Sequence, residues 1–206
     1  MQAVAALNRD RIIAKAIELA DRDGLDAVTL RRIAGELGVH VTSLYNHVPT
    51  RDAVTTGIVD ALVTGADLPV EEIGWEAWVR AFVAAVGEIA VEHPGAFVAL
   101  QRRPVEGAQA TRSFEVALAA FERAGLDAVG AYGAVKATTY VALSIAVERA
   151  LSSRGDGAET AVTHLPAESF PHVHALGSGL DPETTWAFSV DTLVAGLRAQ
   201  ITGSSD

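Results

Sequence analysis

Hydrogen-bonding side chains crowd one short stretch near the start of the chain: His40, Thr42, Ser43, Tyr45, Asn46 and His47. Hydroxyl, imidazole and amide groups can meet the phosphate oxygens and base edges of a nucleic acid, and hydroxyls can also cap the first backbone amides of a helix. Positive charge lies on both flanks of the stretch, in Arg31, Arg32 and Arg51. We interpret the pattern as a recognition helix between phosphate-binding arginines. The alternative is that Tyr45 and His47 only pack in, or solvate, a small three-helix domain.

Two apolar stripes would position these side chains on a helix-turn-helix. One helix carries apolar residues at the spacing i, i+3, i+4 and i+7, at Leu30, Ile33, Ala34 and Leu37. The other carries Val41, Leu44 and Val48. Gly38 lies between the stripes, where a left-handed backbone is usual and glycine adopts it without strain. Pro49 is expected to end the second helix, so the polar residues lie on a short helix that follows a tight turn.

Together with a predicted helix at residues 9–23, this stretch resembles the N-terminal domain of the TetR family of bacterial transcriptional regulators. The resemblance implies a homodimer that binds a palindromic operator and releases it when a small molecule occupies the C-terminal domain. The matching residues are Ile12, Ala16, Leu19, Ala20, Gly24, Thr29, Arg31, Ile33, Ala34, Leu37, Gly38, Val39, Ser43, Leu44, Tyr45, His47, Val48 and Arg51. We therefore expect operator contacts from one group of side chains and phosphate contacts from Thr29 and Arg51. The first group is Arg31, Thr42, Ser43, Tyr45 and His47.

Charge is distributed unevenly along the 206 residues. The formal net charge of −10 argues against a protein that coats nucleic acid without sequence preference. Residues 1–51, however, hold seven of the 16 Lys and Arg and six of the 26 Asp and Glu, a balance of +1. The remaining 155 residues hold the other nine and twenty, a balance of −11. An acidic body of this kind would keep all but the basic end of the protein away from phosphate.

The composition excludes several classes of protein. With 50% hydrophobic and 20% charged residues, the chain is globular rather than disordered. It contains no cysteine, which excludes disulfides, a thiolate nucleophile and a thiolate metal site. The first residues, from Gln2 to Leu7, lack the charged and long apolar parts of a signal peptide. The longest weakly charged run, 130–147, contains Lys136 and several polar residues, so we interpret it as a buried helix rather than a membrane span and expect a cytoplasmic protein.

The apolar periodicity predicts an all-α chain, because no segment shows the alternation of a half-buried β-strand. We expect an N-terminal three-helix helix-turn-helix domain that binds DNA at 1–51, and a larger helical domain for effector binding and dimerisation at 52–206. Asn8 is a plausible helix cap, Thr50 can start the connecting helix, and Asp181-Pro182-Glu183 has the order of a helix start. Helices are expected at about 9–23, 52–66, 75–93, 95–103, 108–124, 127–152 and 182–201, with a loop over 153–179.

The second predicted domain resembles the C-terminal domain of the tetracycline-repressor branch of the same family. The resemblance rests on Arg103-Pro104 and on the closing pattern from Trp186 to Leu197. In that branch the last helix and the long helix before the loop form a four-helix bundle with the same pair of a second subunit. This implies that 127–152 and 182–201 form the dimer surface. The alternative is that both helices are buried inside one subunit.

A ligand pocket is expected among the helices at 75–93, 95–103, 108–124 and 127–152, with a lining that suits an apolar or aromatic effector. Arg103 and Thr139 could equally serve a salt bridge and helix packing. In the tetracycline-repressor branch two histidines stand at the positions of Ala99 and Thr139, one of them assisting a drug-bound magnesium, so we do not expect a tetracycline–magnesium effector here. The residues expected to line the pocket are Phe82, Phe97, Leu100, Arg103, Phe114, Phe121, Thr139 and Tyr140.

Metal-binding and enzymatic interpretations find little in the sequence. His172 and His174 lie two residues apart, but no further ligands follow at a recognisable spacing. The sequence has no nucleophile elbow, no phosphate-cradling glycine loop and no pair of carboxylates that a pattern singles out. We therefore predict no catalytic residue, no metal site and no cofactor.

The sequence thus predicts a homodimeric transcriptional repressor that a small ligand releases from a palindromic operator. Ligand binding would move the connecting helix at 52–66. This would spread the two DNA-reading domains of the dimer (residues 1–51 of each copy, the reading heads) away from the spacing of successive major grooves, about 34 Å. One alternative is an activator without effector control. The other is a helical small-molecule-binding protein whose N-terminal domain no longer reads DNA. Neither the operator nor the effector follows from the sequence.

Overall fold

The computed structural model describes residues 6–103, 105–153, 166–175 and 181–203. Their regular secondary structure is helical, without a strand among them, which confirms the predicted all-α class. No helix within these ranges combines the length and the apolar character that crossing a bilayer requires. The chain divides into two compact units: the first unit is Met1–Asp67 with Glu92–Thr111, and the second unit is Leu68–Val91 with Arg112–Asp206.

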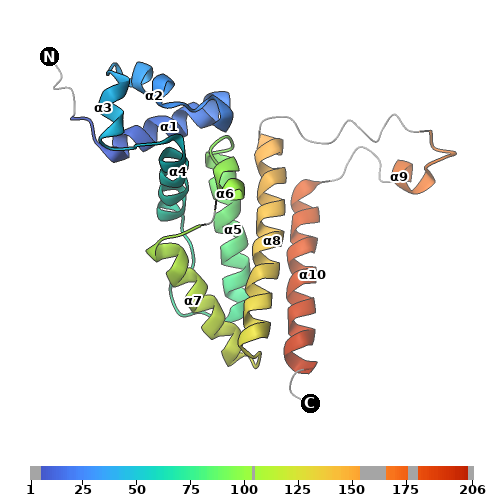
Figure 1. Ribbon diagram of the computed structural model, residues 1–206. Helices are drawn as coiled ribbons and strands as arrows, with labels where there is room; N and C mark the ends of the chain where they lie inside the picture. Colours follow the sequence, from blue (N-terminus) through green and yellow to red (C-terminus); the bar gives the residue numbers. More distant parts are fainter. Residues whose placement is uncertain (1–5, 104, 154–165, 176–180, 204–206) are drawn as a thin grey trace. The chain divides into compact units, whose positions relative to one another are not determined.

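The first unit contains the predicted helix-turn-helix. Its α1 packs against η1, α2 and α4, while α2 packs against α3 and α4 against α6 (Figure 1). The bounds are α1 (Arg9–Asp23), the 3-10 helix η1 (Leu25–Ala27), α2 (Leu30–Leu37), α3 (Val41–Tyr45), α4 (Arg51–Gly65) and α6 (Val98–Arg102). The core is aliphatic, as the apolar stripes predict, and its fully buried members include Ile12, Leu19, Ile33, Leu44, Val48, Val54 and Ile58.

Polar side chains cap three of these helices. Asn8, Thr29 and Thr50 each have an extended backbone, and each side-chain oxygen accepts a hydrogen bond from the backbone N–H three residues on, at 2.9, 3.2 and 3.0 Å. Each bond satisfies one of the amides that a first helical turn leaves without a partner. The predicted starts at Asn8 and Thr50 are confirmed, and Thr29 is a third cap.

The turn between α2 and α3 has the predicted geometry. Gly38 adopts the left-handed conformation, with φ 66° and ψ 30°, and its N–H bonds back to the carbonyls of Ala34 and Gly35. The amide of Val39 also donates to the Ala34 carbonyl, at 3.0 Å. These three bonds satisfy carbonyls at the end of α2, which is how a left-handed residue ends a helix.

The second helix of the motif is shorter than predicted. It ends at Tyr45 instead of reaching Pro49, and Asn46 and His47 form a turn. The reason is that the Leu44 carbonyl accepts from the amides of both His47, at 2.9 Å, and Val48, at 2.8 Å. This convergence tightens the backbone before the proline is reached, and it places Val48 in the core.

The second unit is built from long helices. These are α5 (Trp75–Glu92), α7 (Ala108–Arg123), α8 (Ala128–Ser153) and α10 (Pro182–Gly203), although the last residue of α5 and the first four of α7 belong to the first unit. A short helix, α9 (Pro171–Ala175), corrects the prediction of a loop over the whole of 153–179. It begins with a proline, and the His174 amide donates to the Phe170 carbonyl at 2.9 Å. Residues 154–165 and 176–179 of that loop lie outside the described residues.

Aromatic side chains join α5 to α7 within the second unit. Trp78 stacks on Phe82 of the next turn, with ring centroids 4.8 Å apart. Phe121 of α7 contacts Trp75 at 5.7 Å and meets Trp78 edge-on at 6.4 Å. Trp78 and Phe121 are 1% and 0% exposed, so these rings form a deep core between the two helices.

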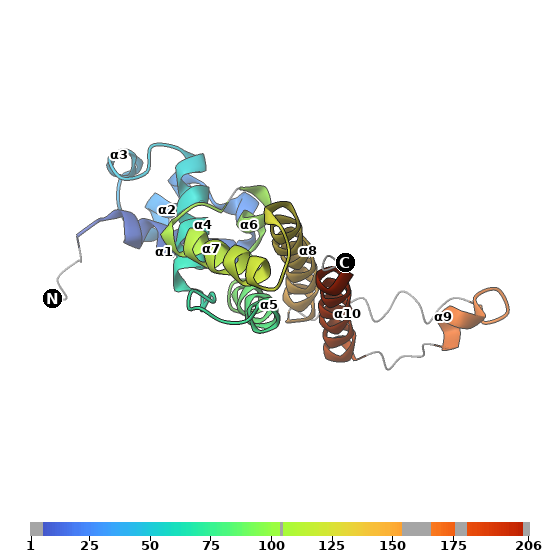
Figure 2. The ribbon, with the colours of Figure 1, turned by 90° about the horizontal axis from the view of Figure 1, so that it is seen from below.

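Polar contacts fasten α10 along α8, beside which it runs in both ribbon views (Figures 1 and 2). The Trp186 indole N–H donates to Glu148 at 2.7 Å, and the Arg149 guanidinium lies 5.3 Å from the centre of the same indole. Arg149 also pairs with Glu183 at 3.3 Å. Two further ion pairs of 2.7 Å tie α10 to α5, Arg80 with Asp191 and Arg198 with Glu76.

Two glycines of the motif provide a test of this local geometry. Gly38→Ala should lower the free energy of unfolding by about 1–2 kcal/mol, because an L side chain is strained in the left-handed region. Gly35→Ala should raise it by about 0.5–1 kcal/mol, because this glycine lies within α2 and an added Cβ meets nothing within 4 Å. Urea unfolding of the two variants measures both changes. Effects of the same sign would contradict the assigned turn.

Candidate functional site

The polar side chains of α3 lie on its outer side. Tyr45 is 50% exposed, Thr42 is exposed, and Ser43 and His47 are half-buried, whereas Leu44 is fully buried. The helix therefore packs on the core through Leu44 and presents hydroxyl groups to solvent, while the imidazole of His47 lies in the turn that follows the helix. This is the arrangement that base-edge and phosphate contacts require.

His40 caps α3, a role that the sequence analysis considered for hydroxyl side chains only. Its Nδ1 accepts from the Thr42 amide at 3.4 Å and lies 2.8 Å from the Thr42 hydroxyl. Because one ring nitrogen receives both groups, the imidazole fixes the start of the helix and the rotamer of Thr42 together. The usual capping residues are Ser, Thr, Asp and Asn, so the sequence signal for this cap was weak.

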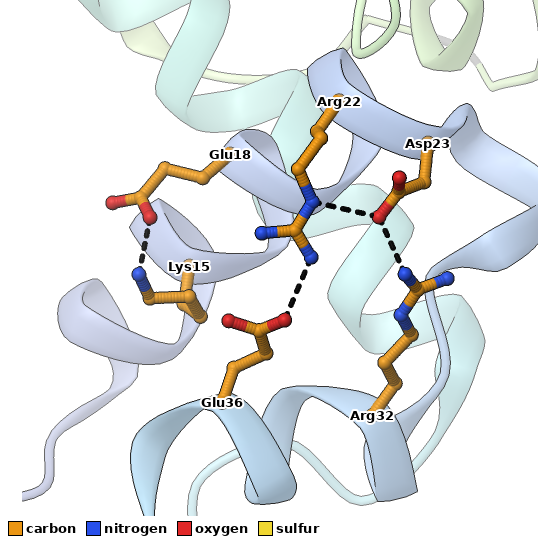
Figure 3. A network of polar contacts seen from close by, with 6 residues as sticks. All are labelled: Lys15, Glu18, Arg22, Asp23, Arg32 and Glu36. Atoms are coloured by element: carbon orange, nitrogen blue, oxygen red, sulfur yellow. Dashed lines mark hydrogen bonds and ion pairs between the residues drawn. The ribbon is translucent and has the colours of Figure 1, made fainter.

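Most arginines near α2 are neutralised by carboxylates of the same unit. Arg22 pairs with Glu36 at 2.6 Å and with Asp23 at 2.9 Å, and Arg32 pairs with Asp23 at 2.5 Å (Figure 3). The hydrogen bonds that Arg22 donates to Glu36 and Asp23 raise the pKa of Arg22 above its ordinary value, and the same guanidinium lowers the pKa of Glu36. Lys15 and Glu18 form a further pair on α1. These contacts hold the end of α1 against α2 and leave less charge for a nucleic acid.

Arg31 differs from its neighbours. It is exposed on α2, and its side chain makes no ion pair with any residue of the described ranges. Arg51, by contrast, donates to the carbonyls of Leu25, at 3.3 Å, and Asp26, at 3.4 Å, and lies 3.5 Å from the Asp26 carboxylate. Arg31 is therefore the predicted arginine that reaches solvent with its charge unopposed.

Asp21 of α1 binds the segment that leads into α6. Its Oδ1 accepts from the backbone amides of Gly95, at 3.0 Å, and Ala96, at 2.9 Å, and its Oδ2 lies 2.8 Å from His93 Nδ1. Gly95 is pressed against α1 so closely that an added Cβ would lie 1.9 Å from the Ala20 carbonyl oxygen. The sequence reasoning missed this contact, because nothing local marks two segments more than 70 residues apart as partners.

The other end of α6 is held by two arginines. Arg102 pairs at 2.8 Å with Asp26, which lies within η1. Arg103 pairs at 2.5 Å with Asp52, in the first turn of α4. The Arg102 guanidinium, with Arg51 adding a smaller effect, holds the pKa of Asp26 below its usual value, and Arg103 does the same for Asp52. Both carboxylates therefore stay charged at neutral pH. These pairs and Asp21 connect α6 to three elements of the reading head.

The comparisons with known proteins agree with this architecture. Residues 12–55 match the family described as "Bacterial regulatory proteins, tetR family". An HTH-type transcriptional regulator of Saccharopolyspora erythraea is 32% identical over 203 residues, which cover 94% of this chain and 85% of that protein. The chain belongs to the tetR family of bacterial regulatory proteins. It is a DNA-binding transcriptional regulator.

Other tetR-family proteins match along nearly the whole chain. The tetracycline repressor protein class D of Escherichia coli is 26% identical over 208 residues, covering 97% of this chain and 93% of the repressor. The crystal structure of the TetR family protein ActR of Streptomyces coelicolor, in complex with actinorhodin, superposes with a TM-score of 0.80 at 26% identity. That match covers 96% of this chain and 99% of ActR.

The eight residues expected to line an effector pocket of this tetR-family chain are divided between the two units. Phe97, Leu100 and Arg103 belong to the first unit, where Phe97 is 1% exposed. The second unit holds the other five, which differ widely in exposure, from Phe121 at 0% to Tyr140 at 62%. The remaining three, Phe82, Phe114 and Thr139, are half-buried. Their common role in ligand binding stays a prediction.

Several of the side chains expected to line the pocket already make contacts within the second unit. Phe114 of α7 meets Tyr132 of α8 edge-on at 6.2 Å, and the Thr139 hydroxyl donates to the Val135 carbonyl at 2.8 Å. Lys136 lies 4.8 Å from the centre of the Tyr140 ring. A groove of about 450 Å³ in the second unit lies elsewhere, at the start of α8 and the end of α10, and its lining includes Gly125, Asp127, Gly130, Leu197 and Gln200. Within the described residues, no group of three or more His, Asp or Glu could hold a metal ion.

The contact of Asp21 with the segment before α6 provides a stability test. Asp21→Ala should lower the free energy of unfolding by about 1–3 kcal/mol, because the amides of Gly95 and Ala96 lose their acceptor. Asp21→Asn keeps an acceptor oxygen and should cost less. Asp67→Ala, which removes an exposed carboxylate of the same unit, is the control. Equal losses from Asp21→Ala and Asp67→Ala in urea unfolding would contradict the contact.

Proposed function

We propose that the protein is a homodimeric repressor that binds a palindromic operator and leaves it when a small apolar or aromatic ligand binds. The observation that carries the proposal is the set of exposed hydrogen-bonding groups on the outer side of α3, together with the exposed and unpaired charge of Arg31 on α2. A recognition helix needs both features, because charge draws the protein to phosphate and hydrogen bonds select the bases.

The proposed contacts follow from exposure and from the bonds already made. Arg31, Thr42, Ser43, Tyr45 and His47 are assigned to the operator bases and their surroundings. Thr29 and Arg51 are assigned to phosphates. The Thr29 oxygen accepts from a helix amide, but its hydroxyl hydrogen stays available to a phosphate oxygen. The pair of Arg51 with Asp26 is a long surface ion pair, which is worth little and which a phosphate can replace.

A selection of bound duplexes from random DNA, at moderate salt, tests the proposal and supplies the operator. Enrichment of one palindrome bound by a dimer is expected. On that operator, Arg31→Ala should weaken binding by roughly 1–3 kcal/mol if the guanidinium reads a base, or reduce the salt slope by about one if it meets a phosphate. Titrations at several salt concentrations separate the two roles.

The matched control for this prediction is Arg112→Ala. Arg112 is an exposed arginine of α7 in the second unit, so the variant changes the net charge equally without touching the reading head. An equal loss of operator binding in both variants would show that only net charge matters. If no sequence is enriched under varied salt and protein concentration, operator binding itself is refuted.

The proposed dimer surface is the outer side of α8 and α10. Large apolar side chains that are exposed in the single chain gather on these two helices, with exposures from 46% to 79%: Val129, Tyr132, Tyr140, Leu151 and Phe188. Exposed apolar groups in this number usually mark an interaction surface. Two copies joined through this side would form the four-helix bundle that the resemblance implies.

Phe188, 71% exposed on α10, tests the dimer. Phe188→Asp should convert the dimer to a monomer in sedimentation velocity, because two carboxylates would be buried across a symmetric interface. Operator affinity should fall with it, since the two half-sites would then be bound independently. Phe170→Asp is the control, because Phe170 is also exposed, at 44%, but lies outside both helices. A variant Phe188→Asp that stays dimeric would refute the assigned surface.

The release by a ligand is supported by two relatives, the tetracycline repressor and ActR in its complex with actinorhodin. We propose that ligand binding displaces α4 and with it the spacing of the two reading heads. The membership of α4 and α6 in the same compact unit as α1–α3 supports this route. Because these helices contact one another, a displacement of α4 or α6 would be passed on to α1–α3. A difference in affinity of a few kcal/mol between the two arrangements is enough for such a switch.

The remaining assignments follow from this role. The proposed functional domains are residues 1–51 for DNA and 52–206 for ligand and dimer. The named relatives are regulators, and we infer that this chain likewise has no enzymatic activity and needs no cofactor. We place its action in the cytoplasm, where bacterial DNA is found.

A further inference from the structure

His40 and Thr42 form a hydrogen-bonded pair at the start of α3. The imidazole Nδ1 of His40 lies 3.4 Å from the backbone nitrogen of Thr42 and 2.8 Å from its hydroxyl oxygen. Both residues are exposed, so the pair lies on the surface of the helix-turn-helix domain. The directions of these two bonds determine which hydrogen-bonding role Thr42 can offer to another molecule.

The backbone amide of Thr42 fixes the direction of the second bond. A backbone N–H can only donate, so the Nδ1 atom that receives it must be the ring nitrogen without a hydrogen. A ring nitrogen without a hydrogen cannot donate, and the Thr42 hydroxyl must therefore donate to the same atom. The hydroxyl hydrogen of Thr42 is thus occupied, whereas its oxygen can still accept a hydrogen bond.

Thr29, the other threonine assigned to DNA, has the opposite polarity. Its oxygen accepts from the Arg32 amide at 3.2 Å, and its hydroxyl hydrogen stays available. That hydrogen suits a phosphate oxygen, which can only accept. Thr42 has no free hydrogen to offer while it is bonded to His40, so a phosphate is not a suitable partner for its hydroxyl. The partner of Thr42 must instead be a group that donates.

We propose that Thr42 reads an adenine or a cytosine of the operator, and that His40 is the positioning residue that sets this preference. The proposal rests on the proposed function and names the chemistry of one operator position. In the major groove, adenine presents the N6 amino group and cytosine presents the N4 amino group, and both donate. Guanine and thymine present only acceptors there. The Thr42 oxygen can accept from the first two bases, but it would face another acceptor on the last two.

The test starts from the palindrome that the selection of bound duplexes yields. Duplexes with each base pair at each position of one half-site are titrated with the wild type and with Thr42→Val, which replaces the hydroxyl by a methyl group. The position at which Thr42→Val changes the base preference is the one that Thr42 reads, and the wild type should prefer adenine or cytosine there.

Base analogues then remove the amino group alone. Purine in place of adenine, or pyrimidin-2-one in place of cytosine, should weaken wild-type binding about three- to tenfold when it is placed in one half-site, the usual value of one hydrogen bond. The same analogue should not weaken binding by Thr42→Val, because that variant has no hydroxyl oxygen to accept from the amino group. This comparison also removes any effect of the analogue on the stability of the duplex.

Two variants of His40 distinguish positioning from a general role in folding. His40→Ala frees the Thr42 hydroxyl to turn and donate, so the preference at this position should fall to less than about twofold while the other positions keep theirs. His40→Asn should retain the preference, because its Oδ1 is an acceptor as many bonds from Cα as Nδ1 is, and asparagine is a usual cap. A purely structural cap would lower the affinity for all sequences alike. If His40→Ala fails to fold, Thr42→Val and the base analogues still decide the proposal.

Several results would overturn the proposal: a Thr42→Val variant that changes no base preference, a wild-type preference for guanine or thymine at the position it changes, or equal wild-type affinity for the base and its analogue. A preference that survives in His40→Ala, or is lost in His40→Asn, would overturn the role of His40. An enriched palindrome combined with any of these results refutes the reading by Thr42 and His40 alone. If no palindrome is enriched, operator binding itself is refuted, and the proposal fails with it.

Discussion

The carboxylate of Asp21 is the contact on which the first unit depends. It holds the turn before α6 through two backbone amides, and Gly95 is the residue that lets this turn approach the end of α1. Arg102 and Arg103 hold the far end of α6 to η1 and α4. Because hydrogen bonds that involve a charged group are among the stronger ones, α6 cannot shift while α1 and α4 stay still without losing several of them. Under the proposed function, a displacement of α6 on ligand binding would therefore reach the helix-turn-helix domain through these named contacts.

The helix-turn-helix domain offers few unpaired charges and many hydrogen-bonding groups to a nucleic acid. Arg22 and Arg32 are taken up by Asp23 and Glu36, and residues 1–51 carry a balance of only +1. Non-specific affinity for DNA comes from phosphate neutralisation, so a head of this kind holds arbitrary sequences weakly. Under the proposed function, its discrimination would then come from the hydroxyl groups of α3, from the imidazoles that flank this helix and from the joint action of two copies of the chain. The carboxylates that reduce the charge also fix the angle between α1 and α2. The same ion pairs therefore orient the two helices and weaken the non-specific attraction of this domain to DNA.

In the second unit, polar contacts fix how α10 packs within one chain, and large apolar side chains remain exposed on its surface. Glu148 and Arg149 of α8 hold Trp186, which is itself 8% exposed, and ion pairs tie α10 to α5. These contacts specify how α10 lies on its neighbours, because each joins named atoms at hydrogen-bond distance. Phe188 and Tyr140 take no part in this attachment and stay 71% and 62% exposed. The division agrees with a surface that is built before association and covered by it.

The features that could be predicted from the sequence are those that depend on residues close together in the chain. Asn8 and Thr50 lie three residues from the amides they bond, and Gly38 ends α2 through carbonyls of the preceding turn, so spacing and residue type were enough. The predicted end of α3 lies too far along the chain. Pro49 sets only the last position at which the helix could end, whereas the helix ends earlier, where the Leu44 carbonyl accepts hydrogen bonds from two amides. The contact of Asp21 with Gly95 joins segments that have no common pattern, and only the packing of the unit brings them together. Ser113 shows the same limit in the second unit. In the sequence it is one small polar residue on a helix, and the lack of a partner for its hydroxyl among the described residues becomes visible only when every neighbour has been placed.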